Sequence, residues 1–311
     1  TWGASNIFSG LAAGTYTIDI EDDNDCPDGI NVTVTEPTIL TVSIANTTNV
    51  SCFGMSDGEI TINANGATPN YEYSINGGAW QSSNIFSNLA AGTYTIDVED
   101  AFDCTDNVTV TITQPSVGVS ATAIFTEPSC FSGTDGSIDV TATGGTPNYD
   151  YSIDGGTTWG ASSIFSGLAA GTYTIDIEDD NDCTDDVQIT ITEPTQLTNT
   201  SSFTEPSCFG DADGEITVTT TGATPNYEYS INGGITWGAS NIFSGLAAGT
   251  YTINVEDDND CPDGINVTVT EPTQLTNTAS FTEPSCFGDA DGEITVTTTG
   301  ATPNYEYSIN G

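Results

Sequence analysis

The 311-residue sequence contains no lysine, no arginine and no histidine, whereas its 44 aspartate and glutamate residues give a formal net charge of −44. Without a cationic side chain, nothing in it would neutralise a phosphate backbone or an anionic lipid surface, so we exclude nucleic-acid binding and binding to such membranes. Catalysis by imidazole, amine or guanidinium groups is excluded as well. We therefore expect a protein that is not an enzyme, whose acidic surface keeps neighbouring chains apart.

Long apolar runs and metal-type cysteine pairs are absent too. No run approaches the 18 apolar residues of a membrane span, so we expect no direct membrane insertion. There are eight cysteines but no C-x-x-C pair of the kind that binds zinc. Cysteines without a metal motif indicate disulfides and an oxidising compartment, so we expect an extracellular protein.

The cysteines reveal an internal repeat of about 78 residues. They fall at two positions of each unit: first at Cys52, Cys130, Cys208 and Cys286, and second at Cys26, Cys104, Cys183 and Cys261. We divide the chain into three whole units (38–115, 116–194, 195–272), preceded by the C-terminal half of a unit (1–37) and followed by an N-terminal half (273–311). No flexible spacer separates the units, so neighbours are expected to abut, and we interpret the sequence as part of a longer repetitive chain.

Each unit consists of short alternating segments rather than helices. In TYTINVE, for example, Tyr251, Ile253 and Val255 alternate with polar residues, which is the period of a β-strand with one buried face. Turn signals separate these segments, and we interpret Asp213-Gly214 as a hairpin turn. Strands of this length predict an all-β fold, a tandem array of immunoglobulin-like antiparallel β-sandwich repeats of seven strands each that forms an extended rod.

Two aromatic positions recur in every unit. The string L-A-A-G-T-Y resembles the tyrosine corner of Greek-key sandwiches, in which the phenol donates a hydrogen bond back to the turn; the tyrosines are Tyr16, Tyr94, Tyr173 and Tyr251. A surface loop carries Trp2, Trp80, Trp159 and Trp237. We favour the interpretation that each tryptophan covers a small core, and we keep an exposed sugar-binding aromatic as the alternative.

An acidic string, EDDNDC or EDAFDC, lies between the last two predicted strands of each unit. Clustered carboxylates near a domain joint are typical of calcium sites, although EDAFDC has lost two of the oxygen ligands. We expect no other cofactor. The candidate calcium ligands are Asp22, Asp23, Asp25, Asp179, Asp180, Asp182, Asp257, Asp258 and Asp260.

The cysteines could pair in two ways. Small secreted domains usually pair within the unit, which would join Cys52 with Cys104, Cys130 with Cys183, and Cys208 with Cys261. Immunoglobulin topology instead places the first and second cysteines at opposite ends of the sandwich, whereas bridged Cα atoms lie within about 7 Å. It therefore favours pairs across the joints, namely Cys52 with Cys183 and Cys130 with Cys261, with Cys26, Cys104, Cys208 and Cys286 paired to neighbouring repeats.

Three strings that occur in this order, SCFGDADGEITV, TGATPNYEYSINGG and FSGLAAGTYTINVEDDNDC, carry a family likeness. Their combination resembles the SprB-type repeat of very large cell-surface adhesins of gliding Bacteroidetes, and the likeness extends over every unit. The resemblance implies secretion through the outer membrane by the type IX system. It also implies a filament on the cell surface that contacts the substratum.

We accordingly predict a non-enzymatic stalk that presents a distal adhesive tip and whose main partners are neighbouring repeats. One alternative is a multivalent module that binds surface polysaccharide through its tryptophan loops. Another is a short subunit that polymerises by strand complementation, in which residues 273–311 of one chain complete residues 1–37 of another.

Overall fold

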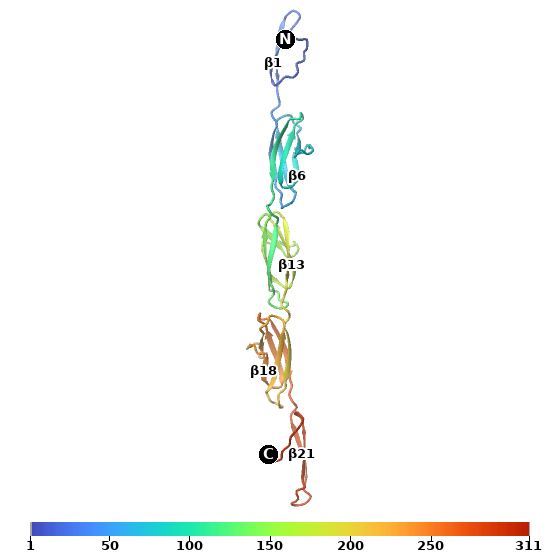
Figure 1. The fold of residues 1–311 in the computed structure, drawn as a ribbon, viewed down its shortest axis with the longest axis vertical. Helices are drawn as coiled ribbons and strands as arrows, with labels where there is room; N and C mark the ends of the chain where they lie inside the picture. The colour runs from blue at the N-terminus through green and yellow to red at the C-terminus, as the bar shows by residue number, and fades with distance from the viewer. Residues whose placement is uncertain (1, 311) are drawn as a thin grey trace.

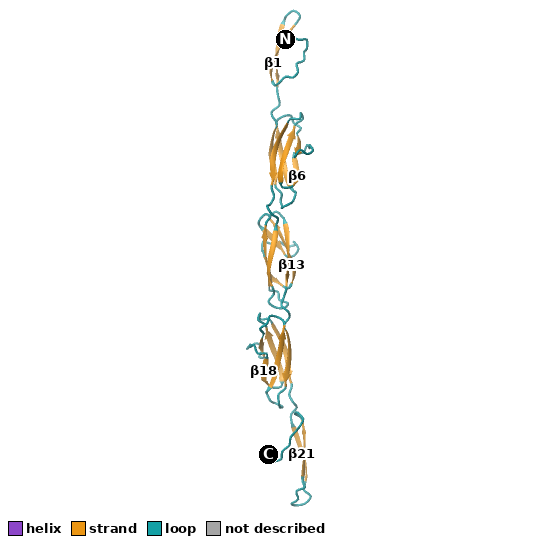
Figure 2. Ribbon diagram, viewed as in Figure 1, coloured by secondary structure: helices purple, strands orange, loops and turns teal. Residues whose placement is uncertain are grey.

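The structure, a computed structural model, describes residues 2–310 as a straight rod of consecutive small domains (Figure 1). These residues form 22 β-strands and no helix, so none of them belongs to a helix that could span a membrane. The strands run along the rod (Figure 2). Thr1 and Gly311, where two chains would join in the strand-complementation alternative, lie outside the described residues.

Each whole unit is a sandwich of two three-stranded antiparallel sheets. In the first unit the sheets have the orders β3-β4-β6 and β5-β7-β8, and the strands are β3 (Thr41–Thr48), β4 (Gly58–Asn65), β5 (Glu72–Ile75), β6 (Ile85–Leu89), β7 (Gly92–Glu99) and β8 (Thr105–Ile112). The predicted immunoglobulin-like sandwich is confirmed. The predicted number of seven strands is wrong, because the seventh is reduced to an isolated bridge between Tyr73 and Gln81.

The other units repeat this topology. The second has the sheets β12-β10-β9 and β11-β13-β14, built from β9 (Ser120–Thr126), β10 (Gly136–Thr143), β11 (Tyr149–Ser152), β12 (Ile164–Leu168), β13 (Gly171–Asp179) and β14 (Thr184–Ile191). The third has β15-β16-β18 and β17-β19-β20, built from β15 (Thr198–Thr204), β16 (Gly214–Thr221), β17 (Glu228–Ser230), β18 (Ile242–Leu246), β19 (Gly249–Glu256) and β20 (Pro262–Val269). Each half-unit is a hairpin, β1 (Gly14–Glu21) with β2 (Pro27–Val34), and β21 (Thr276–Thr282) with β22 (Glu293–Thr299).

A separate apolar core fills each sandwich. In the second unit Ile138, Ile175 and Ile177 are fully buried, and each lies at an alternate position of its strand. The half-units show that two sheets are needed for this burial. Ile216 of the third unit is fully buried, whereas Ile294 at the same position of the C-terminal half-unit is 62% exposed.

The Asp-Gly dipeptide has a different role from the hairpin turn that we predicted. Gly214 is the first residue of β16 and does not have a positive φ angle. A Cβ at this position would lie 2.8 Å from the carbonyl oxygen of Leu246 and 3.2 Å from Cδ of Pro206. The glycine is therefore required by close packing, while Asp213 closes the preceding loop by accepting hydrogen bonds from the backbone and hydroxyl of Ser207.

We expect Gly214→Ala to destabilise the third unit by about 2 kcal/mol, since overpacking against a fixed backbone oxygen costs about 1–3 kcal/mol. The matched control is Gly238→Ala in the same unit, where nothing lies within 4 Å of the new Cβ and φ is not positive. Denaturant unfolding followed by hydrogen exchange of β16 measures both. Equal midpoints for the two variants would show that the close packing does not select glycine.

Candidate functional site: the joints between repeats

The two ends of each unit are formed by two loops that carry its cysteines. We call the segment between the first two strands the opening loop (49–57, 127–135 and 205–213). We call the segment between the last two strands the closing loop (100–104, 180–183 and 257–261). Near the chain's entry to the second unit, the Ala121 N–H donates a hydrogen bond to Asp185 at the start of β14, which places the closing loop at this entry end. At the opposite end, Ser132 N–H of the opening loop donates to the carboxylate of Glu193, just before the chain leaves the unit.

A buried aspartate organises each closing loop. Asp179 is only 4% exposed, and its carboxylate accepts hydrogen bonds from the backbone N–H groups of Thr146 (2.6 Å), Asn181 (2.9 Å) and Cys183 (3.0 Å). Two of these bonds shape the closing loop, and the third holds it against the loop after β10. Asp100 and Asp257 do the same in the other whole units, at 5% and 3% exposure.

The protonation of this loop follows from its contacts. Burial raises the pKa of Asp179, but the backbone hydrogen bonds from Thr146, Cys183 and Asn181 outweigh it, so that the pKa is lowered overall. Glu178 beside it has no such donors, and burial together with the charges of Asp182 and Asp150 raises its pKa. Asp179 is thus held as a carboxylate that serves as an internal acceptor of hydrogen bonds.

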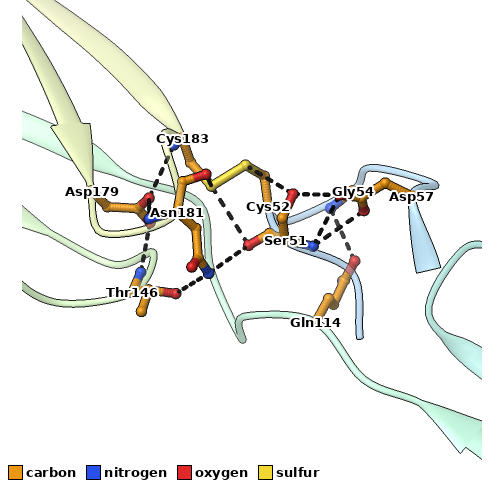
Figure 3. Close-up of a disulfide and its surroundings, with 9 residues drawn as sticks. All are labelled: Ser51, Cys52, Gly54, Asp57, Gln114, Thr146, Asp179, Asn181 and Cys183. Carbon is orange, nitrogen blue, oxygen red and sulfur yellow. Dashed lines mark hydrogen bonds between the residues drawn. A yellow bond between two sulfur atoms is a disulfide. The ribbon is translucent and has the colours of Figure 1, made fainter. Parts of the chain in front are cut away.

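Two disulfides cross the joints. Cys52 in the opening loop of the first unit is bonded to Cys183 in the closing loop of the second, with Cα atoms 5.6 Å apart. Cys130 and Cys261 make the equivalent bond between the second and third units, also at 5.6 Å. Figure 3 shows the first bond between the two loops. The pairing across joints, rather than within units, is the pattern that the structure contains.

An asparagine side chain reinforces each disulfide. The Nδ2 of Asn181 donates to the carbonyl oxygen of Ser51 across the joint (3.3 Å) and to Thr146 Oγ1 within its own unit (2.9 Å) (Figure 3). Asn259 makes the same bond across the next joint, to Ser129 at 3.2 Å. On the other side of the first joint, Gly54 N–H of the opening loop donates to Oε1 of Gln114 in its own unit. Each joint is therefore closed by a covalent bond and a hydrogen bond between loops that are themselves anchored.

The structure does not test the predicted pairing of Cys26, Cys104, Cys208 and Cys286 with neighbouring repeats. Within this chain these four cysteines are unpaired and exposed. Both disulfides join cysteines 131 residues apart, and for these four thiols the corresponding position falls outside residues 1–311. The Asp100 carboxylate, followed by burial, raises the pKa of the Cys104 thiol, so that it is a weaker nucleophile at neutral pH.

Two tyrosines fix the turns of each unit. The hydroxyl of Tyr173 donates to the carbonyl oxygen of Ala169 at 3.0 Å, and Tyr16, Tyr94 and Tyr251 make the same bond to the residue four positions earlier. This is the tyrosine-corner geometry that we predicted. Sequence reasoning missed a second such tyrosine, Tyr149, whose hydroxyl donates to Gly144 at 2.6 Å. Its signal was available, because G-x-x-P-x-Y recurs in each unit.

The structure does not support the candidate calcium site. Within residues 2–310 no group of three or more aspartate, glutamate or cysteine side chains is arranged to hold a metal ion. The physical reason is that the carboxylates do not converge. Asp179 and Asp257 are occupied by backbone N–H groups, as is Asp22 by those of Asn24 and Cys26. The other candidates, Asp23, Asp25, Asp180, Asp182, Asp258 and Asp260, are exposed.

We therefore expect the thermal midpoint of the chain to be the same in EGTA and in millimolar calcium, within the error of the scan. A sodium chloride control at equal ionic strength separates specific binding from screening of the 44 negative charges. A midpoint that rises in calcium but not in the control would restore a metal site.

The tryptophans do not cover the core as we expected. Among the described residues, the three core clusters and the side chains packed against them contain no tryptophan. Instead the ring of Trp159 lies over the glycine pair of its own loop, with Cζ2 3.5 Å from the position of a Cβ on Gly156. Trp2, Trp80 and Trp159 are 64%, 41% and 36% exposed, and Trp237 is half-buried.

Comparison with known proteins identifies the repeat. The model of the SprB repeat matches residues 44–79, 122–158, 200–236 and 278–311, so one match falls in each whole unit and one in the C-terminal half-unit. No curated protein matches the chain.

Solved structures give distant similarities only. The protocadherin GammaB4 extracellular domain is 12% identical, with 89% of this chain and 62% of that chain covered and a TM-score of 0.31. Domains 4–9 of the surface layer protein SbsC are 15% identical, with 81% and 50% covered and a TM-score of 0.24. The chain spans about half to three fifths of the length of these structures, and at such scores the likeness carries no functional argument.

Proposed function

We propose that this chain, which carries four SprB repeats, is a stalk segment of a secreted cell-surface adhesin and holds a distal adhesive tip away from the cell. The observation that carries the proposal is that each joint between whole units is closed by a disulfide. Disulfides persist in oxidising surroundings, which supports an extracellular location. The main partners of a repeat are then its two neighbours, and a role in gliding or surface attachment belongs to the complete adhesin.

The proposal requires the rod to persist in solution. Three whole units and two half-units follow one another along the rod (Figure 1), and each half-unit is a hairpin as long as a whole unit. Five segments of about 35 to 40 Å predict a particle of roughly 190 Å and a radius of gyration of about 55 Å. A compact protein of this length would have a radius of gyration of about 19 Å. Small-angle X-ray scattering of the disulfide-bonded chain distinguishes the two values, and a radius near the smaller one would contradict a stalk.

The exposure of Trp80 and Trp159 supports a second candidate, a multivalent module that binds surface polysaccharide. We expect the stalk to show no retention on immobilised polysaccharides. Retention of the native chain that is weakened in Trp159→Ala, with folding intact, would favour the binding module. Tyr151→Phe in the same unit, where the buried ring stays in the core, is the matched control.

We also propose that the chain has no catalytic activity and no nucleic-acid partner. Both follow from its 44 acidic residues and the complete lack of lysine, arginine and histidine. The same charge keeps neighbouring rods apart, which suits a surface layer of separate stalks.

A further inference from the structure

The disulfides connect different cysteine positions of successive units, and this changes the covalent route along the rod. The second cysteine of one unit is followed closely by the first cysteine of the next, as in the segments from Cys104 to Cys130 and from Cys183 to Cys208. Each of these segments contains the last strand of one unit and the first strand of the next. The segment from Cys104 to Cys130, for example, contains β8 and β9.

The disulfides join these segments end to end. From Cys104 one route follows the chain to Cys130, crosses the disulfide to Cys261 and continues to Cys286. This route bypasses the chain between Cys130 and Cys261, which are 131 residues apart in the sequence. An independent route starts at Cys26, crosses from Cys52 to Cys183 and reaches Cys208, and its bond spans the same separation. We call these two routes the tethers.

The tethers lie side by side in the second unit. Strand β9 belongs to one and β14 to the other, and the hydrogen bond from Ala121 N–H to the Asp185 carboxylate, at 2.9 Å, joins them. Both run along the rod axis, as Figure 2 shows for the strands of every unit. Tension applied along the rod can therefore be carried through this unit by two nearly straight covalent routes.

The core strands of the second unit lie on neither tether. Strands β10 to β13, with the buried Ile138, Ile175 and Ile177, belong to the segment between Cys130 and Cys183. This segment branches from the tethers at its two ends. A pull on the rod therefore does not draw it out as long as the disulfides are intact.

We propose that the chain has a further, mechanical function: its cross-joint disulfides form two parallel, almost inextensible tethers that carry tension and shield the cores from unfolding. A β-strand already rises about 3.3 Å per residue, close to the limit of about 3.6 Å for an extended chain, so a tether has little length to give. Without the disulfides, each unfolded unit of about 78 residues would release a chain of roughly 270 Å.

Two free thiols of the chain allow a direct test, because Cys104 and Cys286 lie at the two ends of one tether. In the variant Cys26→Ser/Cys208→Ser they accept maleimide-linked DNA handles, and optical tweezers stretch the molecule between them. With the disulfides intact we expect the tether to reach a limiting length of about 180 Å without unfolding steps. After reduction the handles should enclose the whole segment from Cys104 to Cys286 and extend to about 640 Å, an increase of about 3.6-fold.

The other tether provides a matched control. Handles on Cys26 and Cys208, in Cys104→Ser/Cys286→Ser, should also give about 180 Å before reduction and about 640 Å after it. Handles on Cys104 and Cys208, in Cys26→Ser/Cys286→Ser, connect different tethers. Their shortest route runs back to Cys52 and across to Cys183, and reduction should lengthen it only about 1.35-fold, from about 270 Å to about 365 Å.

Two outcomes would overturn the proposal. An oxidised molecule that extends stepwise from about 180 Å to about 640 Å between Cys104 and Cys286 would show that the disulfides do not bypass the cores. Failure of Cys104 to take a handle in the oxidised protein after denaturation, where the fold no longer raises the pKa of its thiol, would show that it is bonded within its unit. Neither result would contradict the stalk proposal, because a rod can persist without tethers, and the scattering experiment tests that proposal separately. Conversely, tethers could also carry tension in a glycan-binding array, so finding them would not by itself establish a stalk.

Discussion

Replacing Cys130 and Cys261 together by serine is expected to destabilise the joint between the second and third units by about 3 to 5 kcal/mol. The bond closes a loop of 131 residues, and in the chain-entropy model a loop of this size contributes about 5 kcal/mol, while measured values are usually about 2 to 4 kcal/mol. The effect exceeds that of any single hydrogen bond at the joint, which is worth about 1 kcal/mol.

Hydrogen exchange resolved by peptide measures this change, because a chain of several domains does not unfold in one two-state step. Protection of β10 and β20 should fall in the double variant, since β10 follows the opening loop that carries Cys130 and β20 begins directly after Cys261. Cys26→Ser, which removes an exposed and unpaired thiol, is the matched control and should leave protection unchanged. Equal protection in both variants would mean that the bond does not constrain the joint.

Asp179→Ala is expected to cost the second unit about 3 to 4 kcal/mol. The carboxylate is buried and accepts three backbone N–H groups, and alanine would leave these donors without a partner. A buried donor left unsatisfied costs about 1 to 3 kcal/mol, with partial relief where water can enter the loop. Asp180→Ala, at the exposed neighbouring position, removes the same charge and should change stability by less than about 0.5 kcal/mol.

The effect of Asp179 should depend on pH in a defined direction. Its pKa is lowered in the folded chain from the ordinary value of 3.8, so its stabilisation is fully present above pH 3.8 and is lost as the pH falls through the folded pKa. The raised pKa of Glu178 changes stability with pH in the opposite direction, but Glu178 is present in both the wild type and Asp179→Ala. The difference in stability between the wild type and Asp179→Ala should thus shrink below about pH 4. A difference that stays constant to pH 2 would assign the loss to packing alone.

Much of the fold could be predicted because it rests on local periodicity. Alternation in segments such as TYTINVE determines which residues face the core, and Ile253 and Val255 are indeed fully buried. The repeat of the cysteines along the sequence defined the unit. The sequence favoured pairing of the cysteines across the joints but did not establish it. That choice depends on the distance between the two ends of a sandwich, and sequence patterns suggest the topology without giving this distance.

The site was less predictable, because its chemistry depends on burial rather than on residue type. The string EDDNDC offers several carboxylates, and only the fold shows that Asp179 points inward while Asp180 stays exposed. One signal was present, since the divergent string EDAFDC retains the equivalent of Asp179, which is Asp100, and replaces its exposed neighbour by Ala101. Similarly, Asp-Gly suggested a turn, whereas Gly214 is required by space alone.

The connectivity of the disulfides is the central claim, and peptide mapping under non-reducing conditions tests it most directly. Glu-specific cleavage that spares Glu-Pro bonds leaves four fragments with two cysteines each, 22–59, 100–178, 179–215 and 257–293. With the free thiols alkylated, mass spectrometry should find 22–59 linked to 179–215 and 100–178 linked to 257–293. A link between 22–59 and 100–178 would instead place the bonds within units and contradict both the stapled joints and the tethers.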